Sequence, residues 1–150
     1  MIAKGWCLAK LEVATAEQAI LEIADKLCAH GRVQASFGHA AVLRERRSPT
    51  GVPFASPAVA IPHVGPEHVL LPSIAVATLA SPVAFREMGS PASILDVEIV
   101  IVPAFTAKDQ ASGSLARLIE LLQDDALRRA LVAAHDEAIL VDLLLGRWES

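Results

Sequence analysis

The sequence predicts a single domain of the α/β class. The chain has 150 residues, of which 53% are hydrophobic, enough to form one sizeable core. Its middle part contains apolar runs without helical periodicity, and such runs are typical of buried strands: Ala58–Ile61, Ile74–Leu79 and Leu95–Val102. Segments with helical periodicity precede and follow these runs, and this order favours an α/β fold. We find no internal repeat and no linker-like segment that would divide the chain.

Two helices are predicted before the first strand. Residues Thr15–Gln18 have the form of a capping box, and apolar residues then recur at helical spacing from Ile20 to Leu27. Gly31 is a typical stop signal for this helix. A second, shorter helix is predicted from about Gly38 to Arg47. It ends before Ser48–Gly51, a turn signal that leads the chain into the first strand.

The C-terminal part of the chain is predicted to be helical. From Ser114 onward, leucine and isoleucine recur at the spacing of an amphipathic helix. Two further helices are predicted at Asp124–Ala134 and Asp136–Leu145.

The charge pattern argues against nucleic acid as a partner. The formal net charge is −4, and the densest basic cluster, Arg44, Arg46 and Arg47, is interrupted by Glu45. Binding to a phosphate backbone needs an extended basic surface, which the sequence does not provide.

We expect the protein to be cytoplasmic, without direct insertion into a membrane. Cys7 and Cys28 lie far apart and form no metal-binding or redox motif, so we expect two reduced thiols. The N-terminus lacks the apolar region of a signal peptide. The uncharged stretch from Val69 to Phe85 is interrupted by Pro72 and Pro82, which favours strands over a spanning helix.

His63 draws attention because it stands directly after a predicted strand and a proline. Pro62 has no N–H group to continue the strand pairing, so the His63 ring would lie at the rim of the sheet. An ordinary polar residue at a strand end would look the same. His63 and His68 could form a pair of metal ligands, but no further ligand stands at a recognised spacing, and we expect no metal site.

A longer pattern favours a functional role. The segment from Arg44 to His63 reads RERRSPTGVPFASPAVAIPH. It resembles the RE, PTG and AIPH signature of enzyme IIA components of the phosphotransferase system, in the fructose/mannitol superfamily (the EIIA type 2 domain). The resemblance continues through PEHVLLPSIAVATLASPVAFREMG, LDVEIVIVPAF and LARLIELLQDDALRRAL, and so covers about Thr15 to Leu145 within a single domain of residues 1–150. It implies a mixed sheet of about five strands flanked by helices.

The resemblance also implies roles for individual residues. His63 matches the family's phosphorylated histidine and would accept and donate the phosphoryl group. Arg44 matches the arginine of the RE element, and its guanidinium would stabilise the phosphoryl oxygens. The alternative for Arg44 is a solvated charge at a helix end, paired with a neighbouring acid. Glu45 would shape this corner of the structure and not touch the phosphoryl group.

The sequence departs from the family pattern at Ser114. Mannitol and fructose members carry a second histidine there, whereas this chain reads QASGSLARL. The galactitol-like branch also lacks that histidine, and its sequence pattern at the RE and PTG elements is closest to that of this chain. As an N-cap, Ser114 could help to bind an anion through the exposed N–H groups behind it, or it could simply cap the helix.

The function implied by the resemblance is that of a phosphocarrier. His63 would take a phosphoryl group from phospho-HPr and pass it to a cognate enzyme IIB. The membrane enzyme IIC would then admit a galactitol-like or fructose-like sugar or polyol, and no metal or organic cofactor is implied. One alternative is a regulatory, nitrogen-type IIA protein whose phosphorylation state controls partner proteins. Another is a binding module that never takes phosphate.

Overall fold

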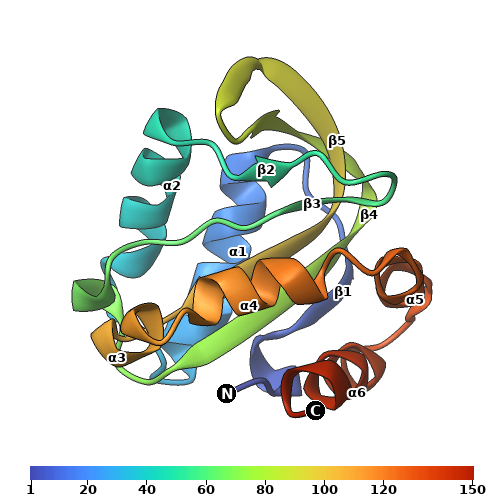
Figure 1. The fold of residues 1–150 in the computed structure, drawn as a ribbon. Coiled ribbons are helices and arrows are strands. Elements are labelled where there is room, and N and C mark those ends of the chain that lie inside the picture. Colours follow the sequence, from blue (N-terminus) through green and yellow to red (C-terminus); the bar gives the residue numbers. More distant parts are fainter.

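The computed structural model describes residues 1–150 and contains a five-stranded mixed sheet with helices on both faces (Figure 1). The strands are β1 (Leu8–Leu11), β2 (Gly51–Val52), β3 (Ala58–Ala60), β4 (Ser73–Glu87) and β5 (Ser90–Ala104). The α-helices are α1 (Ala16–Ala29), α2 (Phe37–Arg47), α3 (Ala107–Ala111), α4 (Ser114–Leu121), α5 (Asp125–Ala133) and α6 (Glu137–Trp148). Two short 3₁₀ helices, η1 (Lys4–Trp6) and η2 (Pro66–His68), complete the chain. The predicted α/β class with a mixed sheet is confirmed.

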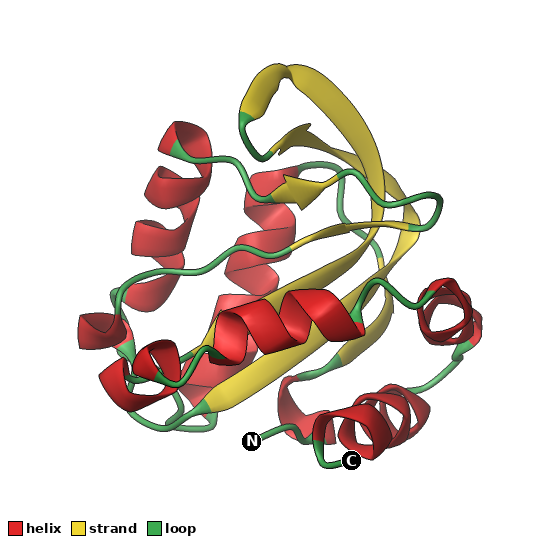
Figure 2. Ribbon diagram, viewed as in Figure 1, coloured by secondary structure: helices red, strands yellow, loops and turns green.

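A long antiparallel hairpin of β4 and β5 forms the centre of the sheet. Strand β1 pairs with β4 in parallel, and β3 pairs with β5 in parallel on the other side. The two-residue strand β2 pairs antiparallel with β3 and also reaches the far end of β4, where Gly51 is opposite Glu87. The tip of the hairpin therefore curls over the sheet towards β2, as Figure 2 shows at the top of the molecule.

The sheet is apolar on both faces, which explains why its inner strands read as continuous apolar runs. Side chains alternate along β4, with Ala75 and Ala77 in the core under α1 and α2. Ile74 and Val76 point into the opposite core, under α4, α5 and α6. The smaller side chains on the first face allow α1 to lie close to the sheet.

Both strands of the hairpin are longer than predicted. The sequence indicated only Ile74–Leu79 and Leu95–Val102, where apolar residues form runs. Beyond Leu79, strand β4 alternates between the buried Val83 and Phe85 and the exposed Ala84 and Arg86, a strand pattern that the prediction missed. The residues of β5 from Ser90 to Ile94 are all exposed, so they carry no hydrophobic pattern. Strands β1 and β2 were missed because they have only four and two residues, too few to show a clear pattern.

The predicted helices are present, with small differences at their ends. The Thr15 side chain accepts a hydrogen bond from the Gln18 N–H at 3.2 Å, and the Gln18 side chain reaches back to the Ala14 N–H at 2.8 Å. The second helix begins at Phe37, one residue before the predicted start, and ends at Arg47 as predicted. The short helix α3 was not predicted, although Thr106 and Asp109 form a complete capping box at its start.

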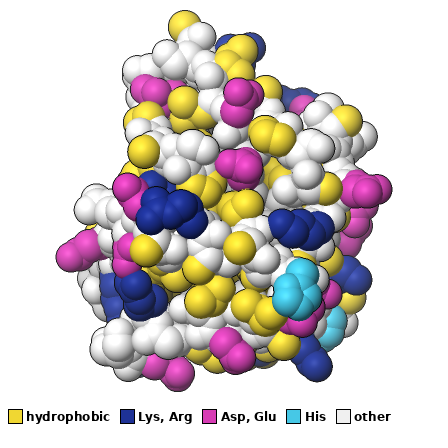
Figure 3. Space-filling model, turned by 90° about the vertical axis from the view of Figure 1, so that its right-hand side faces the viewer, with side chains coloured by type: hydrophobic (Ala, Val, Ile, Leu, Met, Phe, Trp, Pro, Cys, Tyr) yellow, Lys and Arg dark blue, Asp and Glu magenta, His cyan; other side chains and the backbone are white.

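Charged side chains of both signs are mixed on the surface. Figure 3 shows the side that lies on the right in Figure 1, and there basic, acidic and apolar side chains alternate without a continuous basic band. No helix has the length and apolar character that crossing a membrane would require.

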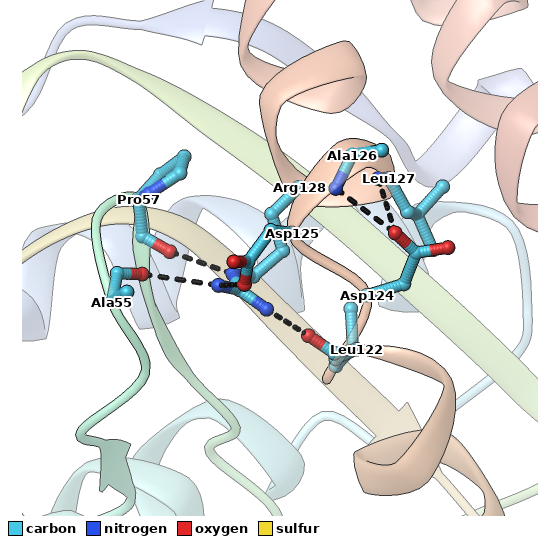
Figure 4. Close-up of polar contacts among 8 residues, drawn as sticks. All are labelled: Ala55, Pro57, Leu122, Asp124, Asp125, Ala126, Leu127 and Arg128. Carbon is cyan, nitrogen blue, oxygen red and sulfur yellow. Dashed lines mark hydrogen bonds and ion pairs between the residues drawn. The ribbon is translucent and has the colours of Figure 1, made fainter.

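A buried arginine joins α5 to the segment that leads into β3 (Figure 4). The Arg128 guanidinium donates to the backbone oxygens of Pro57 at 3.0 Å, Leu122 at 2.6 Å and Ala55 at 3.1 Å, and it pairs with the Asp125 carboxylate. Its side chain is 1% exposed, so these bonds compensate for the loss of water around a buried charge. Arg128 thereby fixes the start of β3, the strand that precedes His63.

Replacing Arg128 by methionine tests this anchor. Arg128→Met leaves buried carbonyl groups without donors, so we expect the free energy of unfolding to fall by about 3 kcal/mol. Urea denaturation measures the loss. Arg129→Met, at the exposed neighbouring position, is the control and should cost little. Equal stability of the two variants would contradict the anchoring role.

Candidate functional site

A pocket of about 500 Å³ lies between α2 and α4, where the sheet ends. Its residues come from four parts of the chain: α2, the segment after β3, the end of β5, and the α3–α4 region. They are Arg44, His63, Val64, Gly65, Pro103, Phe105, Gln110, Gly113, Leu115, Ala116 and Ile119. The pocket therefore brings together Arg44 and His63, which the sequence analysis had singled out, on a largely apolar wall.

His63 is half-buried and held by a hydrogen bond to its own backbone segment. Its Nδ1 lies 2.8 Å from the Ile61 carbonyl oxygen. A carbonyl oxygen only accepts hydrogen bonds, so Nδ1 must carry the proton. Nε2 then carries the lone pair, and it makes no hydrogen bond to the protein. The nucleophilic nitrogen of the ring is thus the one left free.

The surroundings of His63 favour the neutral imidazole. Burial lowers the pKa of His63 below its ordinary value of 6.5. The hydrogen bond to Ile61 opposes this shift, and the positive charge of Arg44 adds to it. His63 is therefore mostly neutral at pH 7, as a nucleophilic imidazole must be.

Arg44 has no acidic partner. It lies on α2 with its side chain exposed, and none of the ion pairs of the protein includes it. Arg46, two residues further on, pairs with Glu17 at 2.6 Å and points elsewhere. The alternative in which Arg44 is a helix-end charge paired with a neighbouring acid does not describe this arrangement. Its guanidinium fork remains available to an anion in the pocket.

Glu45 does not line the pocket. Its carboxylate accepts hydrogen bonds from the Thr50 N–H at 2.9 Å and from the Thr50 hydroxyl at 2.7 Å. Burial raises the pKa of Glu45, while the two bonds from Thr50 oppose the shift. Thr50 in turn accepts the Ile61 N–H through both its carbonyl and its hydroxyl oxygen, each at 3.2 Å. Glu45 is thus bonded to the turn whose Thr50 holds the Ile61 N–H, two residues before His63.

The prediction that Ser114 is an N-cap is wrong. Helix α4 begins at Ser114, and its N-cap is Gly113, whose φ of 79° is left-handed. Glycine adopts this conformation without strain, so the turn closes at Gly113 and Ser114 becomes the first helical residue. The Ser114 hydroxyl lies 3.2 Å from that of Ser112 and does not line the pocket.

Sequence reasoning missed Gln110, which lies at the end of α3 and lines the pocket. Its side-chain amide makes no hydrogen bond to the protein, so it can donate to a bound oxygen. The signal that could have found it is the Thr106 capping box, which sets the short helix and hence the direction of residue 110.

His68 lies outside the pocket lining, with Nδ1 2.8 Å from the Ser36 hydroxyl. No group of three or more His, Cys, Asp or Glu side chains is arranged to hold a metal ion.

The effect of the Arg44 charge on the pKa of His63 can be tested by substitution. Arg44→Gln removes a positive charge that disfavours the imidazolium, so the pKa of His63 should rise. An NMR pH titration of the imidazole measures it. Arg47→Gln removes the same charge from the same helix outside the pocket and should change this pKa less. Equal shifts in both variants would show that the side chain of Arg44 does not face His63.

Comparisons with known proteins agree with this fold. No curated protein sequence matches the chain. Mannitol IIA from Escherichia coli has the same fold, with a TM-score of 0.76 at 22% identity, over 96% of this chain and 99% of that one. A complex of enzyme IIA-Mtl with phosphorylated enzyme IIB-Mtl from Escherichia coli matches with a TM-score of 0.76 at 20% identity, over 97% and 99% of the chains.

A regulatory protein shares the fold as well. The nitrogen regulatory protein IIA-Ntr from Neisseria meningitidis matches with a TM-score of 0.72 at 18% identity, over 95% of each chain. The family model described as "Phosphoenolpyruvate-dependent sugar phosphotransferase system, EIIA 2" matches residues 1–146. The chain therefore belongs to the EIIA type 2 family of the phosphoenolpyruvate-dependent sugar phosphotransferase system.

Proposed function

We propose that this protein is a phosphocarrier in which Nε2 of His63 accepts a phosphoryl group from phospho-HPr and donates it to a cognate enzyme IIB. The observation that carries the proposal is the 2.8 Å bond from Nδ1 to the Ile61 carbonyl, which leaves Nε2 free beside an unpaired arginine. Family membership supports the reaction class. The protein would act in the cytoplasm, where both partners meet it.

The transfer step balances without a further reactant. The Nε2 lone pair of His63 attacks phosphorus, the bond between phosphorus and the donor's histidine nitrogen breaks, and the donor imidazole leaves with the electron pair. Nδ1 keeps its proton throughout, so the phosphorylated ring carries a positive charge that the Ile61 carbonyl stabilises. That charge also makes the ring a good leaving group when enzyme IIB attacks. No metal or organic cofactor is needed because the phosphoryl group arrives already activated.

The other pocket residues would stabilise and protect the group. Phosphoryl transfer depends mainly on positioning and on stabilising charge on the phosphoryl oxygens. Arg44 would bind two of these oxygens with its fork, and the Gln110 amide would donate to a third. The apolar side chains of Phe105, Leu115 and Ile119 would exclude water, which otherwise hydrolyses the phosphoramidate. Ser114 lies outside this arrangement, so we assign it no contact with the group.

The role in sugar uptake depends on the partners. The structure of a IIA–IIB complex with the same fold supports an enzyme IIB as acceptor for this chain. A membrane enzyme IIC would complete the route for a sugar or polyol, and the absence of a second histidine among the pocket residues supports a galactitol-like substrate. The nitrogen regulatory protein of Neisseria meningitidis supports a second candidate, in which phospho-His63 is a signal. Transfer of the phosphoryl group to an enzyme IIB of the same organism favours transport, whereas a phosphoryl group that stays on His63 favours regulation.

The phosphocarrier proposal predicts one phosphoryl group on one histidine. Incubation with phosphoenolpyruvate, enzyme I and HPr should add a single phosphoryl group by intact mass, and the adduct should be labile in acid and stable in alkali. His63→Ala should abolish it. His68→Ala and Ser114→Ala remove two other candidate acceptors that lie outside the pocket lining, and both variants should retain the adduct. A label that persists in His63→Ala, or that survives acid, would refute the assignment.

A further inference from the structure

Thr50 is buried between α2 and β3, and its hydroxyl both donates and accepts a hydrogen bond. Thr50 is 2% exposed. Its Oγ1 donates to the Glu45 carboxylate at 2.7 Å and accepts from the Ile61 N–H at 3.2 Å. A hydroxyl has a single hydrogen, so the carboxylate determines the direction of that hydrogen and leaves an oxygen lone pair for Ile61.

Ile61, whose N–H is bound by Thr50, is also the residue whose carbonyl accepts the hydrogen bond from His63 Nδ1. Ile61 is fully buried, and the next residue, Pro62, removes the possibility of strand pairing beyond it. The Ile61 N–H is shared between the hydroxyl and the carbonyl oxygen of Thr50, each at 3.2 Å, which restricts the rotation of Ile61, and the Ile61 carbonyl oxygen lies 2.8 Å from His63 Nδ1. A continuous chain of hydrogen bonds therefore leads from Glu45 through Thr50 and Ile61 to the imidazole.

We propose that Thr50 is a positioning residue that keeps His63 in the Nδ1–H tautomer, with Glu45 orienting the Thr50 hydroxyl. The two residues touch neither the pocket nor a bound group, so they act through Ile61 alone. The consequence for phosphoryl transfer rests on the proposed function, because only the tautomer with a free Nε2 lone pair can attack. The tautomer itself does not depend on any reaction.

This role differs from that of an ordinary buried threonine. Thr78 is also fully buried and its hydroxyl also accepts a backbone N–H, from Lys10 at 2.9 Å, but it lies between β1 and β4, away from the pocket. Removing either hydroxyl costs a buried hydrogen bond. Only the loss at Thr50 should change the state of the His63 ring.

The test compares three substitutions in the whole, unphosphorylated protein. Thr50→Val keeps the shape and removes the hydroxyl, Thr50→Ser keeps the hydroxyl, and Thr78→Val is the matched control. The ¹⁵N shifts of the His63 ring nitrogens at pH 8 give the ratio of the two neutral tautomers. Thr50→Val should move the population towards the Nε2–H form and slow phosphorylation by phospho-HPr about tenfold. Thr50→Ser and Thr78→Val should leave both measurements close to those of the unaltered protein.

An unchanged tautomer ratio in Thr50→Val would overturn the proposal, whatever happens to the rate. A tautomer shift in a protein that never accepts phosphate would retain the proposal and reject the phosphocarrier function, so the two failures are distinguishable. If Thr50→Val does not fold, Glu45→Gln gives the second measurement. Its amide presents a donor to the Thr50 hydroxyl where the carboxylate accepted, so it should shift the tautomer ratio in the same direction. A ratio unchanged in Glu45→Gln would then overturn the proposal.

Discussion

The hydrogen bond from His63 Nδ1 to the Ile61 carbonyl decides what the site can do, because it determines which nitrogen of the ring is a nucleophile. The bond lies one residue beyond β3 and spans two residues, so it exists only while the end of this strand is held in place. Thr50 holds the strand end from one side, through the Ile61 N–H. Arg128 holds the segment before the strand from the other side, through the carbonyls of Ala55 and Pro57. The local geometry of a single imidazole thus depends on contacts from α5 and from the turn after α2.

The architecture explains why the remaining pocket residues meet at this point. Strand β3 runs parallel to β5, so both strands end at the same edge of the sheet, and the pocket takes His63 from one and Pro103 and Phe105 from the other. Helices from opposite faces then close around this edge. Helix α2 contributes Arg44 from one side, and the α3–α4 region contributes Gln110 and an apolar wall from the other (Figure 1). The apolar wall and Arg44 together lower the pKa of His63, so burial and charge both keep its nitrogen nucleophilic at neutral pH.

Much of this could be predicted from the sequence, but only where local patterns carry the information. The helices have clear periodicity, the buried parts of the strands are apolar runs, and the RE, PTG and AIPH elements identify His63 and Arg44 together. The exposed end of the β4–β5 hairpin carries no hydrophobic pattern, and the two-residue strand β2 is held by pairing with β4, which no local pattern records. Gln110 lines the pocket because it lies on the five-residue helix α3. Ser114 does not line the pocket, and the N-cap of α4 is Gly113. The link between Glu45 and Thr50 depends on side-chain direction in three dimensions, although both residues belong to recognised motif elements.

The most direct test of this account is to identify the nitrogen that carries the phosphoryl group. The ¹⁵N-histidine-labelled protein, phosphorylated through phospho-HPr, can be examined by NMR for phosphorus–nitrogen coupling and for the proton on the second ring nitrogen. We expect a phosphoryl group on Nε2 of His63, with Nδ1 still protonated and bonded to the Ile61 carbonyl. A phosphoryl group on Nδ1 would contradict this expectation, because Nδ1 donates its hydrogen bond to the Ile61 carbonyl oxygen.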